Sequence, residues 1–329
     1  MRGAARLIAA AAVPLLAVSA CSWGHAATQH PAKPSRTVAS PSPGPFKTAP
    51  RYPRVYKPCE GKVPEPFAGI ATNGHFAANV ATFQHDTGAH LRLVEFYNRF
   101  PGSFQRGEAQ QVVDLGGLPL IQLNPRKISM TELAAGAYDG YIRAYAQQVR
   151  SFGCHVVLSF GHEMNGWWYT WGLPETTPRT FKAAWRHVHH IFTAEHVRNV
   201  IWSWDPTHQF SQYRPGKVAY PASMFYPGNR YVDWIGIDGY VRPGENFNKV
   251  FRFQLRDIRR LTRKPIYLAE TGVSDNEFEV RQVKSLFAGV WRWHLAGLVW
   301  FDLNRKNSWS LDGKPIKDAA YRKAVSRFP

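Results

Sequence analysis

Nucleic-acid-binding motifs are missing from this 329-residue sequence, although its formal net charge is +18. It has no zinc-finger cysteine spacing, no RNP-like stretch and no basic heptad helix, and its lysines and arginines are scattered. A serine nucleophile elbow, a phosphate-binding loop and an internal repeat are also missing. These absences argue against a DNA or RNA partner. The charge predicts a solvated basic surface or, second, attraction to an anionic envelope polymer or an acidic substrate.

Long apolar runs are confined to the N-terminus. After two arginines, an apolar segment from Leu7 to Val18 has the form of a signal peptide and is too short for a membrane span. It leads into "VSAC", which resembles a bacterial lipoprotein processing site and predicts lipidation of Cys21. Ordinary cleavage near Ala26 or Ala27 is the alternative. We therefore expect an exported protein, held at the extracellular face of the cell membrane by a lipid on Cys21 or secreted.

The sequence divides into three parts. Residues 1–20 form the expected lipoprotein-type signal peptide. Residues 21–63 contain eight prolines between positions 28 and 58, with Ser, Thr and Lys among them, and predict a semi-extended tether. Residues 64–329 form the expected single catalytic domain. The whole chain is 44% hydrophobic, which is sufficient for one sizeable core.

Short apolar segments alternate with segments of helical periodicity through this third part. The expected strands are 66–72, 91–97, 118–124, 154–163, 199–206, 232–240, 265–273 and 297–304. One long helix is expected over 130–153. Eight such units predict an α/β fold, a (β/α)₈ TIM barrel. A doubly wound open sheet is the alternative, but the first turn, "GIATNGH", lacks its glycine-rich pattern.

Cysteine is scarce, with three residues in the chain. Besides Cys21, the sequence has Cys59 and Cys154, each just before an expected strand, so both could lie at the same end of the barrel. An exported protein can keep a disulfide, and we expect one between them. Two free buried thiols are the alternative.

Two glutamates end expected strands and carry the functional prediction. In a (β/α)₈ barrel the reactive residues gather at the C-terminal ends of the strands, so Glu163 and Glu270 should face one mouth. A protonated and an ionised carboxyl group facing one cleft can together cleave a glycosidic bond. Asp205 and Asp302 also end strands, and we expect them to order loops.

Four segments strengthen this interpretation. "GHEMNGWWYTWG", "DWIGIDGY", "IYLAETG" and "GLVWFDLN" resemble strands four, six, seven and eight of glycoside hydrolase family 26, in the same order. The resemblance covers roughly residues 64–310. It implies a retaining (β/α)₈ enzyme that is best known as a β-mannanase and uses two catalytic glutamates.

The resemblance also assigns roles to single residues. Glu163 resembles the general acid/base and Glu270 the nucleophile. Among the substrate-binding positions, His162 resembles a sugar-holding histidine and Tyr240 the tyrosine that hydrogen-bonds the nucleophile. The remaining substrate-binding candidates are Trp168 near the leaving-group side, Trp300 as a platform under the sugar, Asn165 and Trp204. Asn165 could instead hold its loop through backbone bonds, and Trp204 could be a packing residue.

The sequence therefore predicts a secreted endo-β-glycanase that cleaves β-1,4-mannan-type polysaccharide, acts as a monomer and uses no cofactor. Mixed-linkage β-glucan, β-1,3-xylan and an envelope polysaccharide are alternative substrates, and a non-catalytic carbohydrate-binding wall protein is the alternative class. No metal site is expected. "HEMNG" lacks the second histidine of a zinc protease motif, and His187 and His190 should lie on an outer helix.

Overall fold

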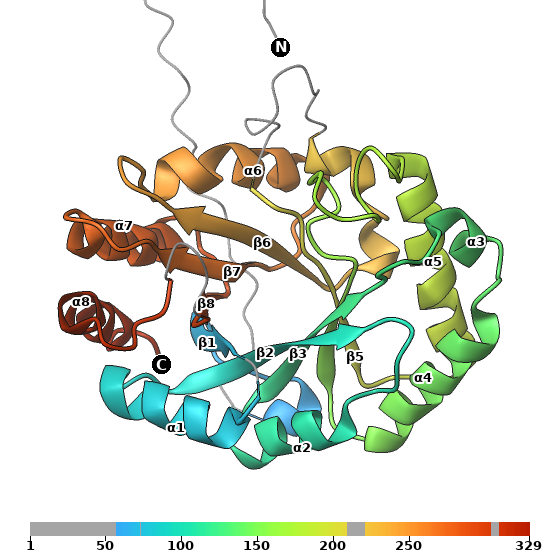
Figure 1. Cartoon of the computed structure of the whole chain (residues 1–329), viewed down its shortest axis with the longest axis horizontal. Coiled ribbons are helices and arrows are strands. Elements are labelled where there is room, and N and C mark those ends of the chain that lie inside the picture. The colour runs from blue at the N-terminus through green and yellow to red at the C-terminus, as the bar shows by residue number, and fades with distance from the viewer. Residues whose placement is uncertain (1–56, 73, 209–220, 304–308) are drawn as a thin grey trace, which may run out of the picture. The chain divides into compact units, whose positions relative to one another are not determined.

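Eight parallel strands form a closed barrel in the computed structural model, which describes residues 57–72, 74–208, 221–303 and 309–329 (Figure 1). The strands follow the order of the sequence, and the last pairs with the first. Their bounds are β1 (Phe67–Ala71), β2 (Leu91–Arg99), β3 (Leu118–Asn124), β4 (Val156–Phe160), β5 (Val200–Trp204), β6 (Trp234–Val241), β7 (Ile266–Val273) and β8 (Gly297–Phe301). The predicted (β/α)₈ barrel is confirmed, and every expected strand is present within a few residues of its predicted bounds.

Helices surround this barrel (Figure 1). They are α1 (Phe76–Thr87), α2 (Arg106–Asp114), α3 (Met130–Ala134), α4 (Asp139–Phe152), α5 (Pro178–Ala194), α6 (Phe247–Leu261), α7 (Glu279–Arg292) and α8 (Pro315–Val325). Short 3₁₀ helices lie at η1 (Pro58–Glu60), η2 (Ala222–Phe225) and η3 (Asn229–Tyr231). The apolar spacing of the sequence did not single out α8.

Local sequence signals fix where several helices begin. The hydroxyl of Ser129 accepts from the backbone N–H of Glu132 at the start of α3, and Thr177 caps α5 directly before a proline. Asn246 caps α6 by accepting from the N–H of Lys249. Each cap satisfies a backbone donor that the first helical turn leaves unpaired.

The prediction of a single helix over residues 130–153 is wrong. The structure has two helices there, α3 and α4, separated by residues 135–138. Gly136 adopts φ 94° between them, a conformation that glycine reaches without a Cβ clash. The apolar spacing continues through this break, so periodicity alone did not reveal it.

Side chains alternate between two apolar layers along each strand. On β8, Val299 and Phe301 belong to the cluster inside the barrel, whereas Leu298 and Trp300 belong to the larger cluster between the barrel and its helices. Neighbouring strand residues point to opposite faces of the sheet, so the layer that a residue joins depends on its parity along the strand.

A disulfide between Cys59 and Cys154 joins η1 to the start of β4. The backbone N–H of His155 also donates to the carbonyl of Cys59, and Val63 is buried. The folded unit therefore already contacts the barrel before residue 64, the predicted start of the domain. Because Cys154 precedes β4, the disulfide lies at the end of the barrel opposite the strands' C-terminal ends.

The predicted signal peptide, Cys21 and most of the predicted tether lie outside the described residues. Within the described ranges, no helix is both long enough and apolar enough to cross a membrane.

Candidate active site

A cleft of about 610 Å³ opens at the C-terminal ends of the strands. Its lining includes Tyr97, Asn124, Glu163, Tyr240, Glu270 and Trp309. They come from β2, β3, β6, β7 and the segments that follow β4 and β8. The barrel therefore brings both predicted catalytic glutamates, 107 residues apart in sequence, to one cleft.

Glu163 sits on an unusual turn after β4. Its φ is 54°, and its backbone N–H donates to the carbonyl of Asp205 at 2.7 Å. The indole Nε1–H of Trp168 donates to the Glu163 carboxyl at 2.6 Å. Burial, and then the charge of Glu270, raise the pKa of Glu163 to about 8, against the opposing effect of the Trp168 bond. These surroundings favour the protonated form of Glu163 at neutral pH, which is the form that can donate a proton.

The surroundings of Glu270 on β7 differ from those of Glu163. The hydroxyl of Tyr97 donates to its Oε1 at 2.7 Å, and that of Tyr240 donates to its Oε2 at 2.6 Å. Burial and the charge of Glu270 raise the pKa of both tyrosines well above the usual value, so both remain donors. Donors at both oxygens suit a carboxylate, which only accepts.

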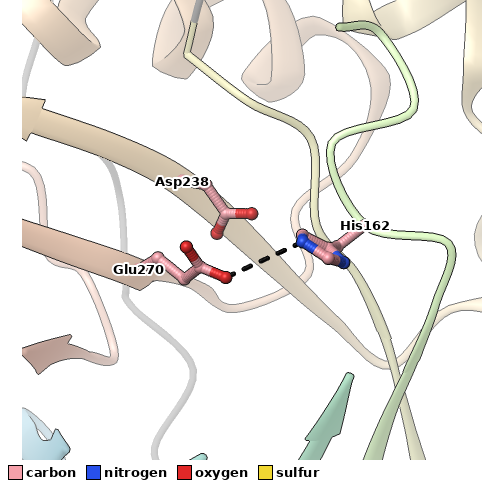
Figure 2. Close-up of side chains that lie close together, drawn as sticks. All are labelled: His162, Asp238 and Glu270. Atoms are coloured by element: carbon pink, nitrogen blue, oxygen red, sulfur yellow. Dashed lines mark ion pairs between the residues drawn. The ribbon is translucent and has the colours of Figure 1, made fainter. Parts of the chain in front are cut away.

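His162 and Asp238 point toward Glu270 (Figure 2). His162 Nε2 lies 3.8 Å from Glu270 Oε1, while its Nδ1 lies 2.8 Å from the side-chain oxygen of Asn124. That oxygen only accepts, so Nδ1 carries the proton. Burial lowers the pKa of His162 to about 3, so the ring is neutral beside the carboxylate. Asp238 is the pairing partner of Glu270 across β6 and β7.

These three groups offer atoms within 4.8 Å of one another that could contact a cation. Burial and then the charge of Glu270 raise the pKa of Asp238 well above its usual value, which favours the neutral acid. Polar atoms placed in this way can also hydrogen-bond the hydroxyl groups of a sugar.

A buried polar layer supports the glutamates from inside the barrel. The amide of Gln122 donates to Glu95 at 2.9 Å and to Asp205 at 3.2 Å, and Asp205 also accepts the backbone N–H of Gly236 at 3.0 Å. A Cβ at Gly236 would lie 2.3 Å from Asp205, so only glycine allows this approach. Asp205 orders the site, as the sequence predicts, through its side chain and through its carbonyl.

Aromatic rings form one wall of the cleft. Tyr240 stacks on Trp309 with ring centroids 4.6 Å apart and an interplanar angle of 28°. The guanidinium of Arg242 lies 5.9 Å from the centre of the Trp309 ring. Apolar ring faces beside polar groups suit a sugar, which has both kinds of surface.

The expectation that Trp300 forms the platform is wrong. Trp300 is fully buried between β8 and α8, 5.1 Å from the ring of Tyr321, and does not line the cleft. Its indole N–H donates to the carbonyl of Trp309 at 3.0 Å. The parity of β8 turns Trp300 away from the mouth, and Trp309 from the following loop lies in the cleft instead.

Trp204 and Asn165 also fail as sugar contacts. Trp204 is fully buried in the outer layer, 5.1 Å from the ring of Tyr226. Asn165 is buried, and its amide makes two hydrogen bonds of 2.9 Å with the backbone of Thr207. It holds one mouth loop to another, which is the alternative that the sequence left open.

Sequence reasoning missed three residues of this site: Tyr97, Asn124 and Trp309. Tyr97 follows Glu95 by two positions on β2, so strand alternation turns both side chains inward and could have identified Tyr97. Asn124 is the last residue of β3, and Glu270 lies near the end of β7. The position of Asn124 at a strand end could therefore have identified it. Trp309 lies in a loop, where no periodicity indicates its direction.

The outer histidine pair lies where the sequence places it. His187 is on α5, outside the barrel, and its Nε2 lies 2.6 Å from Asp139 on α4. It plays no part in the cleft.

Comparison with known proteins identifies a family. The model of "Glycosyl hydrolase family 26" matches residues 136–310, just over half of the chain. Endoglucanase H of Acetivibrio thermocellus is 27% identical over 265 residues, covering 75% of this chain and 29% of that protein. A mannan endo-1,4-beta-mannosidase of Bacillus subtilis is 29% identical over 136 residues, covering 39% of this chain and 34% of that protein. The chain therefore spans only about a third of these relatives.

Solved structures agree on the fold. GH26C from Muricauda sp. MAR_2010_75 superposes with a TM-score of 0.61 at 15% identity, covering 80% of this chain and 86% of that one. A GH26 β-mannanase from Bacteroides ovatus gives a TM-score of 0.59 at 18% identity, with the same coverage of 80% and 86%. At such identities the likeness supports the barrel fold alone.

Proposed function

Because the chain belongs to glycosyl hydrolase family 26, we propose that it is an endo-β-glycanase that hydrolyses β-1,4-mannan-type polysaccharide by double displacement. One observation carries the proposal. Two glutamates line one cleft in opposite environments, with Glu163 protonated by its surroundings and Glu270 held by two hydroxyl donors. Such a pair of environments divides acid and nucleophile roles between two like residues.

In the first step, a carboxylate oxygen of Glu270 forms a bond to the anomeric carbon. The bond from that carbon to the glycosidic oxygen breaks as Glu163 gives that oxygen its proton. In the second step, Glu163 takes a proton from water, the water oxygen bonds to the anomeric carbon, and the bond to Glu270 breaks. His162, Tyr240 and Tyr97 hold the nucleophile and the sugar in place.

The substrate assignment follows the relatives. Mannan endo-1,4-beta-mannosidases support a mannan, whereas Endoglucanase H, which aligns with 75% of this chain, supports a β-glucan as the second candidate. The Tyr240–Trp309 wall suits either polymer, because both present apolar sugar faces.

A polysaccharide panel tests the assignment. Wild type would release reducing ends from galactomannan or glucomannan, or from barley β-glucan if the second candidate is right. The panel also includes β-1,3-xylan, an alternative substrate from the sequence. Glu163→Gln and Glu270→Gln should each lower turnover by about 10²–10⁴-fold. Glu277→Gln is the matched control, because Glu277 is an exposed carboxylate that does not line the cleft. Binding without cleavage by wild type would instead favour the non-catalytic wall protein.

An activated aryl glycoside separates the two roles. The leaving group of the aryl glycoside needs no proton, so Glu163→Ala should still form the glycosyl–enzyme. Added azide should speed the breakdown of the glycosyl–enzyme, because azide attacks without help from a general base. Glu270→Ala should fail at the first step. Cleavage of the aryl glycoside that survives in Glu270→Ala would remove Glu270 from the nucleophile role.

We also propose export, with a lipid on Cys21, and action as a monomer. The expected result is an N-terminal peptide of the cell-derived protein that begins at acylated Cys21 in mass spectrometry. A mature N-terminus near Ala26 or Ala27 would show ordinary secretion instead. Light scattering of the purified protein tests the monomer.

A further inference from the structure

The solvent-facing side of α6 carries positive charge alone. The exposed ionisable residues of this helix are Lys249, Arg252, Arg256 and Arg260, and the exposed Arg263 follows directly after it. We call these five residues the α6 cationic face. The first four are spaced three and four positions apart, so they form one stripe roughly 17 Å long on one side of the helix.

The opposite side of α6 fixes the direction of this stripe. Phe247, Val250, Phe251, Leu255 and Ile258 are buried against the barrel. Asn246 caps the first turn. The helix cannot turn about its axis without exposing these side chains, so its cations are a permanent feature of the surface.

Nothing in the described chain neutralises the α6 cationic face. None of its five members forms an ion pair there, and Lys249 Nζ contacts only the carbonyl of Gly244, at 3.5 Å. The one acid of the helix, Asp257, is half-buried and accepts the backbone N–H of Ser223 at 3.2 Å. Like charges three and four positions apart on a helix repel one another, and an external polyanion would offset that repulsion.

An exposed aromatic side chain lies within the same stripe. Phe253 is 58% exposed and follows Lys249 by one helical turn. Met224 is 41% exposed and belongs to η2, which packs beside α6. A soluble polyanion would use the cations alone. A lipid surface uses both, because phosphate headgroups meet the cations and the interface accepts the apolar side chains.

We propose that the α6 cationic face docks on an anionic phospholipid bilayer, with Phe253 entering the headgroup region. The helix runs along the outside of the barrel, beside β6 (Figure 1). The cleft with the two glutamates opens at the strands' C-terminal ends. Docking through α6 therefore leaves the cleft open to a polymer. The proposal is independent of the catalytic assignment.

Vesicle co-sedimentation tests the docking. Residues 48–329 contain all eight strands, the helices and the disulfide as one compact unit, so this unit is used without the N-terminal apolar segment. It should bind vesicles of phosphatidylglycerol mixed with phosphatidylcholine and not vesicles of phosphatidylcholine alone. The Arg252→Glu/Arg256→Glu variant should bind at least about tenfold more weakly, since each surface cation contributes to attraction by anionic lipid.

A charge-matched variant controls for total charge. Arg179→Glu/Arg198→Glu makes the same change in net charge at two exposed arginines, on α5 and in the segment after it. It should keep most of the binding. An equal loss in both variants would mean that diffuse protein charge, and not the α6 cationic face, attracts the vesicles, and would overturn the proposal.

A fluorescent label tests the entry of residue 253. With Cys59 and Cys154 bonded, the Phe253→Cys variant of residues 48–329 has a single free thiol for an environment-sensitive dye. The dye emission should shift to the blue when anionic vesicles are added. Part of this shift should remain at a salt concentration that screens the attraction between the cations and the lipid. Binding to soluble polyglycerol phosphate without binding to vesicles would also overturn the proposal, and would indicate a wall polymer as the partner.

Discussion

Glu163 occupies a backbone conformation that residues with a Cβ seldom adopt. A left-handed φ of 54° costs roughly 1–2 kcal/mol for such a residue. The bonds to the carbonyl of Asp205 and from the indole of Trp168 hold it there. The turn directs the carboxyl group into the cleft, where burial and Glu270 raise its pKa. Strain of this kind is typical of functional positions.

Removal of the Trp168 bond should shift the pH profile. The active form of Glu163 is protonated, so activity should be lost as pH rises through about 8. The Trp168 bond favours the ionised form, so Trp168→Phe should raise the pKa and move the alkaline limb to higher pH. The measurement is kcat/KM against pH. Trp291→Phe, at an exposed site on α7, is the control, and a limb that moves to lower pH would contradict the prediction.

Tyr97 should contribute as much to kcat/KM as Tyr240, although the sequence pointed only to Tyr240. Each donates one hydrogen bond to Glu270, and a bond to a charged group contributes about 1.5–3 kcal/mol. Tyr97→Phe should therefore lower kcat/KM by about 10–100-fold. Tyr226→Phe removes a surface hydroxyl bonded to Asn229 and should have little effect. Equal kinetics for the two variants would exclude a role for Tyr97.

At the scale of elements, strand parity decides which aromatic residues reach the cleft. Val299 and Phe301 of β8 face the barrel interior, and Trp300 between them faces the helices. Trp300 then bonds the carbonyl of Trp309, whose ring lies in the cleft. β8 therefore supplies a packing residue directly, and the loop that follows it supplies a ring that lines the cleft.

Two tryptophan truncations should separate these roles. Trp309→Ala should raise KM about tenfold, equivalent to ~1.4 kcal/mol, because a wall of the cleft is lost. Trp204→Ala should lower the free energy of unfolding by about 3–5 kcal/mol and leave the KM of the folded enzyme unchanged, because Trp204 only packs. Thermal melts and initial rates measure both. A raised KM in Trp204→Ala would return Trp204 to the substrate-binding set.

At the scale of the whole molecule, the disulfide and the proposed catalytic glutamates lie at opposite ends of the barrel. The disulfide joins residues 95 positions apart next to the start of β4, and the glutamates lie at the other end. Separation of this kind is usual in (β/α)₈ barrels, whose mouth loops hold the chemistry.

Loss of the disulfide should therefore reduce stability and spare activity. Cross-linking restricts the unfolded chain, and removal of a bond that closes so long a loop should cost about 2–5 kcal/mol. The Cys59→Ser/Cys154→Ser variant should melt at a lower temperature, with kcat/KM at 25 °C within about twofold of wild type. A large loss of activity in a variant that still melts cooperatively would mean that the two ends are coupled.

Much of the fold could be predicted from the chain itself. The segments around Leu120 and Val157 are short, apolar and bounded by turns, so their strands needed no tertiary information. Glu163 and Glu270 could be placed at strand ends for the same reason. The break at Gly136 could not, because one glycine within a continuing apolar pattern does not disclose whether a helix ends there.

Sequence alone determined the alternation of strands and helices, the barrel that it implies, and the two glutamates that share its mouth, because these depend on local periodicity and chain order. Tertiary structure decided which rings surround those glutamates. Trp300 and Trp204 turn outward, Tyr97 turns inward and Trp309 arrives from a loop. Those directions depend on strand parity relative to the closed sheet and on contacts between segments far apart in the chain, which local pattern does not contain.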